Sequence, residues 1–330
     1  MRSNPSGEFA QLRALSASLL KLADLARSTP TQTMLQESLE VLRALVSFDS
    51  AWWGEVSDFA GDAAPQNWLN GSIGLAQSFA QEWNQISARD DFALQSIAQL
   101  GVVVRLSDAD DAQAPPPEVA AFSQRHGLYH CMAITATLPH SGLMFFVSVY
   151  RSKSHAPFTA VEEVLFGAFV SHLLHHWRYA LERLQVVPPS RAWDSHALAD
   201  PSGRLLFVGL RIAQALKSAY PQWPGSVLPY ELQSALRDRP SSFLASRSCR
   251  LRLEPCGPLI AISLPSSNYK SLLSPRELGA ATLYASGHSN KEIAATLGLT
   301  PTTVRTYLRS AYAQLGVHNK LELFTALRKA

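Results

Sequence analysis

Three hydrogen-bond donors lie close together near the C-terminus. Arg305 and Arg309 are four residues apart and Thr306 follows the first, so a helix would present all three on its outer face. Such side chains can reach base edges and phosphates. The segment from Lys270 to Ala330 holds eight Lys/Arg against three Asp/Glu, whereas the preceding residues hold 21 against 23. This local excess of positive charge would attract a polyanion, although charge alone is equally compatible with an ordinary basic surface.

Three helices are predicted to position these donors. A capping residue precedes each of them, with a glutamate three positions later in the first two: Ser274 with Glu277, Ser289 with Glu292, and Thr300. A short helix, a turn at Gly298 and a longer helix from Pro301 have the spacing of a helix-turn-helix. Apolar residues recur at intervals that would clamp the second and third helices together: Ile293, Ala294, Leu297, Leu299, Val304 and Leu308.

The segment LSPRE…ASGHSNKEIAATLGLTPTTVRTYLRSAYAQLGVHNKLEL resembles the LuxR-type (also FixJ/NarL-type) four-helix DNA-binding domain, over the final sixth of the chain. The resemblance implies that the third helix enters the major groove of double-stranded DNA. It implies base contacts for Arg305 and Thr306, and base or phosphate contacts for Arg309. Thr303 and Lys291 would contact the DNA backbone. Lys320 stands where the family usually has an arginine, at the start of the fourth helix. The complete implied interface is Lys291, Thr300, Thr303, Val304, Arg305, Thr306, Arg309 and Lys320.

Two positions depart from that family. Gly279-Ala280-Ala281 replaces an acidic residue followed by two bulky apolar ones, and Tyr307 stands where histidine is frequent. These changes bear on core packing and fine sequence specificity, whereas the basic pattern of the third helix is kept. The alternative is a helical interaction module that does not bind DNA.

The N-terminal half has the element order of a sensory domain. Periodicity and turn residues predict helices at 8–27, 34–46 and 75–86, strands at 50–56 and 102–106, and an acidic, proline-rich loop at 108–117. Strands at 129–138 and 143–150 flank the turn-like Pro139-His140-Ser141-Gly142. A long helix at 159–184 begins with the capping pair Thr159 and Glu162, and Pro188-Pro189 ends this part. The layout resembles a GAF-type domain.

A second, smaller sheet is predicted after the diproline. Strands at 195–199, 204–208, 247–253 and 259–264 surround helices at 210–218 and 229–237, and the order resembles that of a PAS domain. The expected fold class is therefore α+β. We expect a GAF-like domain with an N-terminal helix at 1–188, a PAS-like domain at 190–267 and the all-α helix-turn-helix domain at 268–330.

Aromatic residues are concentrated in the first predicted domain. Side chains of this kind can enclose a flat or acyl-bearing small molecule, and they can equally fill a core. The candidate pocket residues are Trp52, Trp53, Trp68, Trp83 and Tyr129. Autoinducer-sensing relatives carry a recognisable set of Trp, Tyr, Asp and Trp residues in their sensory domain. We do not assign this set to particular residues of the present sequence.

Other reactive residues have simpler explanations. His172, His175 and His176 have metal-ligand spacing on the long helix, but a solvated or dimeric face explains them better, and no metal or cofactor is predicted. Cys131, Cys249 and Cys256 form no CxxC pair. Cys249 and Cys256 have arginines nearby, which leaves a cysteine sensor as an alternative to ordinary strand positions.

The sequence offers no catalytic motif: a Gly-rich phosphate loop, a GxSxG elbow and an HExxH pair are all absent. It also lacks a signal peptide and a bilayer-length apolar run, so we expect a cytoplasmic protein that does not contact the membrane. We expect a homodimeric transcription regulator whose partners are DNA, RNA polymerase and a small-molecule ligand. The alternatives are an adaptor that binds proteins through its tail and an autoinducer-responsive quorum-sensing regulator.

Overall fold

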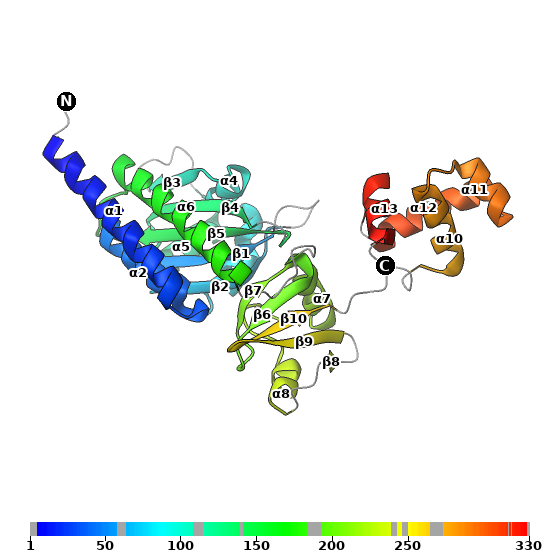
Figure 1. Cartoon of the computed structure of the whole chain (residues 1–330). Coiled ribbons are helices and arrows are strands. Elements are labelled where there is room, and N and C mark those ends of the chain that lie inside the picture. The colour runs from blue at the N-terminus through cyan, green and yellow to red at the C-terminus, as the bar shows by residue number, and fades with distance from the viewer. Residues whose placement is uncertain are drawn as a thin grey trace. The chain divides into compact units, whose positions relative to one another are not determined.

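The computed structural model describes residues 5–57, 64–107, 115–138, 141–183, 193–238, 243–245, 250–264, 273–315, 317 and 319–328. The chain divides into two compact units, Met1–Ser263 and Leu264–Ala330. The first contains two antiparallel sheets and the second is helical, which confirms the expected α+β class (Figure 1). Among the described residues, no helix combines the length and apolar character that a membrane-spanning segment needs.

The first sheet has the strand order β2-β1-β5-β4-β3, and all its pairs are antiparallel. Its strands are β1 (Ser50–Val56), β2 (Asn67–Ile73), β3 (Val103–Ser107), β4 (His130–Leu138) and β5 (Leu143–Arg151). The expected strands 50–56, 102–106, 129–138 and 143–150 are confirmed. β2 was not expected, because Asn70-Gly71 has the composition of a turn. Gly71 instead pairs with Trp53, whose indole covers it so closely that a Cβ there would lie 2.3 Å from the ring.

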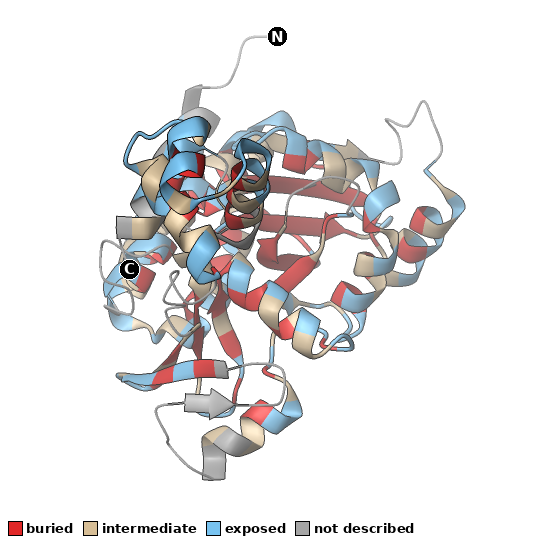
Figure 2. Cartoon of the chain, turned by 90° about the vertical axis from the view of Figure 1, so that its right-hand side faces the viewer, coloured by how far each residue is buried: buried red, intermediate tan, exposed pale blue. Residues whose placement is uncertain are grey.

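Helices cover both faces of this sheet. On one face α1 (Pro5–Ser28), α2 (Thr31–Leu45) and α6 (Ala160–Arg183) pack on one another and on the strands. On the other lie α3 (Phe79–Ile86), α4 (Asp91–Ala98) and α5 (Pro117–His126), with a 3₁₀ turn at Ser87–Arg89. Figure 2 shows the strands largely buried between the helices. The expected helix 75–86 begins only at Phe79, and α4 and α5 were not expected.

The second sheet has the order β7-β6-β10-β9-β8, which is the order of the first sheet when each is counted from its own first strand. It consists of β6 (His196–Ala199), β7 (Leu205–Val208), β8 (Phe243–Ala245), β9 (Arg250–Cys256) and β10 (Leu259–Ser263), with helices α7 (Leu210–Ala219) and α8 (Tyr230–Asp238) and a 3₁₀ turn at Trp193–Ser195. The expected pairs of strands and both helices are present, and the short β8 is additional. The predicted boundary at Pro188-Pro189 lies outside the described residues.

The two sheets are joined within one unit. The Val208 N–H donates to Glu55 Oε2 at 3.2 Å, and the Ser226 N–H donates to the Trp68 carbonyl at 3.1 Å. Leu198 and Phe207 of the second sheet belong to the same buried cluster as the helix-covered face of the first. The sheets therefore share apolar packing as well as hydrogen bonds.

The C-terminal unit consists of α10 (Pro275–Ala285), α11 (Asn290–Leu297), α12 (Pro301–Leu315) and α13 (Lys320–Arg328). Both expected capping boxes are present, at Ser274 with Glu277 and at Ser289 with Glu292. Gly298 ends α11 with φ +64°, a left-handed conformation that glycine adopts without a steric penalty. The caps and this turn set the angle at which α12 leaves α11.

We predict that Ser289→Ala destabilises α11, because it removes the hydroxyl that accepts from the Glu292 N–H. Losing such a cap costs about 1 kcal/mol, which corresponds to about fivefold faster hydrogen–deuterium exchange across Asn290–Leu297. Ser289→Asp is the control, because its carboxylate can still cap the helix. Unchanged exchange in Ser289→Ala would show that the cap does not determine the stability of α11.

Candidate functional site

The expected reading face lies on the solvent side of α12. Arg305, Thr306 and Arg309 are exposed, whereas Val304 and Leu308 on the opposite side are buried against α11. No acidic side chain among the described residues forms an ion pair with either arginine. Both guanidinium groups therefore face solvent with their donors available to an anionic partner.

Each remaining residue of the predicted interface has a defined environment. Lys291 is exposed on α11. Thr300 caps α12 by accepting from the Thr303 N–H at 3.1 Å, and the two hydroxyls are 2.8 Å apart. Lys320 is exposed, with Nζ 4.8 Å from the centre of the Tyr284 ring. Its alkyl chain thus lies beside the helical core, and its ammonium group remains on the surface.

The expectation of DNA contact is wrong for Val304. Its side chain is fully buried between α10, α11 and α12, in a cluster with Ile293 and Leu308. A residue with no exposed surface cannot contact DNA directly. Val304 holds α12 in place so that its neighbour Arg305 faces outward.

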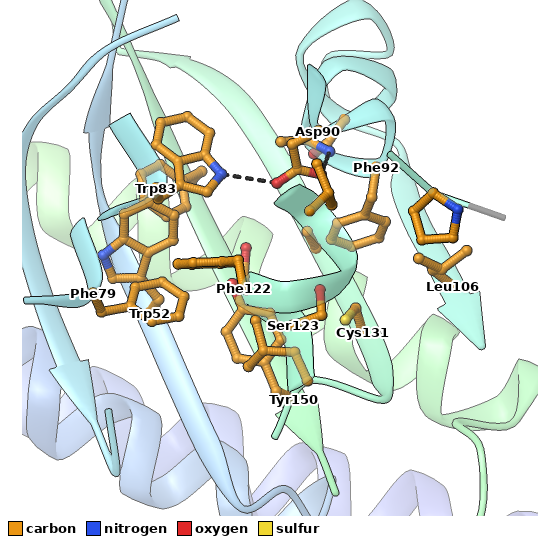
Figure 3. Close-up of a pocket in the computed structure, with 18 of the residues that line it drawn as sticks. Trp52, Phe79, Trp83, Asp90, Phe92, Leu106, Phe122, Ser123, Cys131 and Tyr150 are labelled. Atoms are coloured by element: carbon orange, nitrogen blue, oxygen red, sulfur yellow. Dashed lines mark hydrogen bonds between the residues drawn. The ribbon is translucent and has the colours of Figure 1, made fainter. Parts of the chain in front are cut away.

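A cavity of about 460 Å³ lies in the first unit, between the sheet and helices α3 to α5 (Figure 3). Of the expected pocket residues, Trp52, Trp83 and Tyr129 line it. Most of its wall is aromatic or aliphatic. A space of this size and composition suits a largely apolar small molecule.

Asp90 fixes one side of this cavity. Its Oδ2 accepts from Trp83 Nε1 at 2.8 Å, and its Oδ1 accepts from the Ala93 N–H at 3.1 Å, which caps α4. Figure 3 shows the indole and the carboxyl group facing each other. Burial raises the pKa of Asp90 despite these bonds. The pair orients the Trp83 ring along the cavity wall.

The aromatic residues of the wall form one cluster. The Trp52 ring centre lies 5.0 Å from that of Phe79, 5.1 Å from Trp83 and 4.5 Å from Phe146, all in edge-to-face geometry. Such pairs stabilise one another beyond their burial. On the opposite side, burial raises the pKa of the Tyr150 hydroxyl well above its ordinary value, so this group stays neutral.

Two of the expected pocket residues lie elsewhere. Trp53 packs on the opposite face of the sheet, in the cluster under α1, α2 and α6, because successive strand residues point to opposite faces. Trp68 lies next to the second sheet, with its ring centre 6.3 Å from that of Trp223. Neither residue lines this cavity, so the expectation that all five residues share one pocket is wrong, but Trp53 lines a second cavity where the two sheets meet.

Several cavity residues were missed from the sequence. Asp90, Phe122, Cys131 and Tyr150 all line the cavity. Asp90 could have been found as the N-cap of a helix, since an aspartate before an apolar run is a helix-start signal. The others lie on α5, β4 and β5, and only the folded arrangement brings them together.

The three histidines of α6 lie wholly or partly at the surface. His172 and His175 are exposed and His176 is half-buried, with its pKa lowered by burial and by the neighbouring histidines. Within the described part of the chain, no group of three or more His, Cys, Asp or Glu residues could hold a metal ion. Cys131 is buried in the cavity wall and Cys256 is half-buried on β9, while Cys249 lies outside the described residues.

Two solved structures show a distant similarity to the chain, one over nearly its whole length and one over half of it. Escherichia coli SdiA is 12% identical, with 95% of this chain and 96% of that chain covered and a TM-score of 0.41. A GAF domain/HD domain protein from Geobacter sulfurreducens is 18% identical, with 50% and 98% covered and a TM-score of 0.34. Both likenesses are remote, and no functional inference rests on them.

The C-terminal unit has a closer match in sequence. Over 57 residues the chain is 42% identical to the HTH-type transcriptional activator RamA from Corynebacterium glutamicum. This match spans 17% of the present chain and only 20% of that relative. Residues 271–327 match the family described as bacterial regulatory proteins, luxR family. The C-terminal unit is therefore a helix-turn-helix domain of the luxR family.

Proposed function

We propose that this protein is a DNA-binding transcription regulator whose C-terminal unit reads promoter DNA under the control of its N-terminal unit. Arg305 and Arg309, exposed on α12 and without an ion-pair partner among the described residues, carry the proposal, within a domain that matches the luxR family. The opposite face of α12 is packed into the unit, so these arginines project from a fixed support. An arginine can bind a guanine edge through two hydrogen bonds, and a recognition helix in the major groove presents such groups to the bases.

The cavity of the first unit is the proposed input site. It would take a small molecule with an apolar body, because among the described residues that line it only Asp90 and Lys153 are charged. Asp90 already accepts two hydrogen bonds from the protein, and Lys153 is exposed. An autoinducer-like acyl compound is one candidate within this class.

We place the sensory region in two parts, a GAF-like domain at 1–188 and a PAS-like domain at 190–267, followed by the helix-turn-helix domain at 268–330. The common strand order of the two sheets supports two related sensory folds. The protein acts in the cytoplasm without enzymatic activity, and RNA polymerase is its partner at the promoter.

A homodimer is the proposed assembly. α1 packs against α6, and both helices leave large apolar side chains exposed. These residues, the apolar stripe, are Phe9, Leu12, Leu20, Val161, Val164 and Tyr179. A second copy of the chain would cover the stripe in a self-complementary manner. Dimerisation would also bring two reading helices together, one for each half of a palindromic DNA site.

The alternative is an adaptor that uses the same helices to bind a protein. The surface of α12 favours DNA, because its exposed centre consists of Arg305, Thr306 and Arg309 rather than an apolar patch. Steep loss of DNA affinity with rising salt distinguishes the regulator from the adaptor.

We predict that the double variant Arg305→Ala/Arg309→Ala loses at least about tenfold in DNA affinity at fixed salt, since each bidentate arginine contributes about 1–3 kcal/mol. Band-shift titration would use duplexes enriched by the parent protein from a random library. Arg178→Ala/Arg211→Ala, at exposed positions of the first unit, is the matched control and should bind normally. Equal affinity of the first double variant and the parent would refute the assigned reading face.

We predict that Ala93→Phe fills the cavity and reduces binding of the neutral fluorescent probe N-phenyl-1-naphthylamine at least about tenfold, because the added ring occupies the apolar space. Ala93 lines the cavity from α4. Ala98→Phe, at an exposed position of the same helix, should bind the probe normally. If both variants bound the probe like the parent, the cavity would not be the binding site.

We predict that Leu20→Glu/Val164→Glu converts the dimer to a monomer, because it replaces two exposed residues of the apolar stripe by carboxylates. Sedimentation velocity at micromolar concentration measures the change. Lys21→Glu also reverses charge on α1 but leaves the stripe intact, so it should remain dimeric. A monomeric parent protein, or a dimeric double variant, would rule out this interface.

A further inference from the structure

A second cavity of about 160 Å³ lies in the first unit, where the second sheet meets the first. Residues from several parts of the chain line it: the first turns of α2, strands β1, β2 and β5, helix α6, and the β6–β7 turn with the start of β7. Among its residues are Gln32, Glu55, Trp177, Asp200 and Arg204. Cavities at such junctions are frequent ligand sites, and this one is too small for a drug-sized molecule.

Two buried polar atoms in the wall of this cavity have no hydrogen-bond partner. Glu55 and Trp177 are each 1% exposed. Glu55 Oε2 accepts from the Val208 N–H at 3.2 Å, but Glu55 Oε1 has no partner, and neither has Trp177 Nε1. A buried polar atom without a partner destabilises the folded state. Neither atom is open to a water-sized molecule as the side chains stand, so a ligand in the cavity would satisfy both after a small shift of the two side chains.

Both unpartnered atoms of the wall can act as donors. Burial raises the pKa of Glu55 well above its ordinary value, which favours the protonated form of its carboxyl group. Because Oε2 accepts from Val208, the proton belongs on Oε1, which then donates. The Trp177 indole can only donate. The carboxylate of Asp200 is already engaged, since its Oδ1 accepts from Ser202 and from the Arg204 N–H.

Positively charged groups beside the cavity would also attract an anion. Arg204 is exposed, and its guanidinium group forms no ion pair with an acidic side chain among the described residues. Thr31 and Gln32 belong to the first turn of α2, which has no side-chain cap. The N-terminus of a helix carries partial positive charge and favours an anion.

We propose that this second cavity binds a small organic carboxylate, whose oxygens accept hydrogen bonds from Glu55 and Trp177 and whose charge is balanced by Arg204. The ligand contacts both sheets and would therefore couple the two parts of the sensory region. This site is separate from the aromatic cavity and does not depend on DNA binding.

The site has a defined pH dependence. Glu55, Asp200 and Arg204 are the titratable or charged residues among those that line it, from β1 and from the β6–β7 turn. Glu55 donates only while protonated, so the affinity is complete below its raised pKa and falls as the pH increases through that value.

Isothermal titration of the full chain would use aliphatic mono- and dicarboxylates from acetate to adipate as probes, with the matching amides as controls. We expect at least one carboxylate to bind with one molecule per chain and at least about tenfold more tightly than its amide, because charge-assisted hydrogen bonds are stronger. Trp177→Phe keeps the ring and removes the donor, and should bind about tenfold more weakly. Circular dichroism and thermal unfolding verify that each variant is folded.

The variant Glu55→Gln distinguishes a ligand-binding role of Glu55 from a purely structural one. The amide can still accept from Val208 and donate into the cavity, so the variant should bind the carboxylate with an affinity that no longer changes with pH. Three results would overturn the proposal: no carboxylate binds, Trp177→Phe binds like the parent, or the pH dependence persists in Glu55→Gln. Each of these leaves the proposed DNA binding untouched, since no DNA is present.

Discussion

The buried contact between α11 and α12 determines what the C-terminal unit can present to a partner. Val304 and Leu308 are held against Ile293 and Ala294, so that side of α12 is unavailable. At 3.6 residues per turn, burying Val304 and Leu308 leaves Arg305 and Arg309 outside. The capping residues Ser289 and Thr300 and the left-handed Gly298 keep the two helices in this relation. The chemistry of the reading face thus follows from apolar packing on the other side of the same helix.

A similar division of faces organises the first sheet. Trp52 and Trp53 are adjacent, but one belongs to the aromatic wall of the large cavity and the other to the core under α1, α2 and α6. The helices on the two faces of the sheet therefore have different structural roles. Those under Trp53 form the core and expose the apolar stripe, while α3 to α5 enclose a space that the side chains do not fill. The second sheet is joined to this arrangement through Glu55, a carboxyl group that the sequence gives no reason to place in a core.

Local signals in the sequence predicted much of this structure. The capping boxes, the hairpin of β4 and β5 and the helical spacing around Val304 depend on residues a few positions apart, so they are visible before folding. β2 was missed because Asn70-Gly71 has turn composition, and its glycine is required instead by the Trp53 ring. The cavities could not be predicted, because their walls combine residues from distant strands and helices. Because successive strand residues point to opposite faces, Trp52 and Trp53 could not both line the same pocket. This alternation alone does not tell which of the two lines it.

The central claim is that the outer face of α12 reads DNA sequence. Its most direct test is the sequence preference of the full chain, measured by sequencing duplexes selected from a random library, for the parent and for Arg305→Ala. The account predicts enrichment of a palindrome with half-sites about one helical turn apart, and loss of preference at one position of each half-site in the variant. An unselective parent protein, or a variant with the same preference at every position, would contradict it.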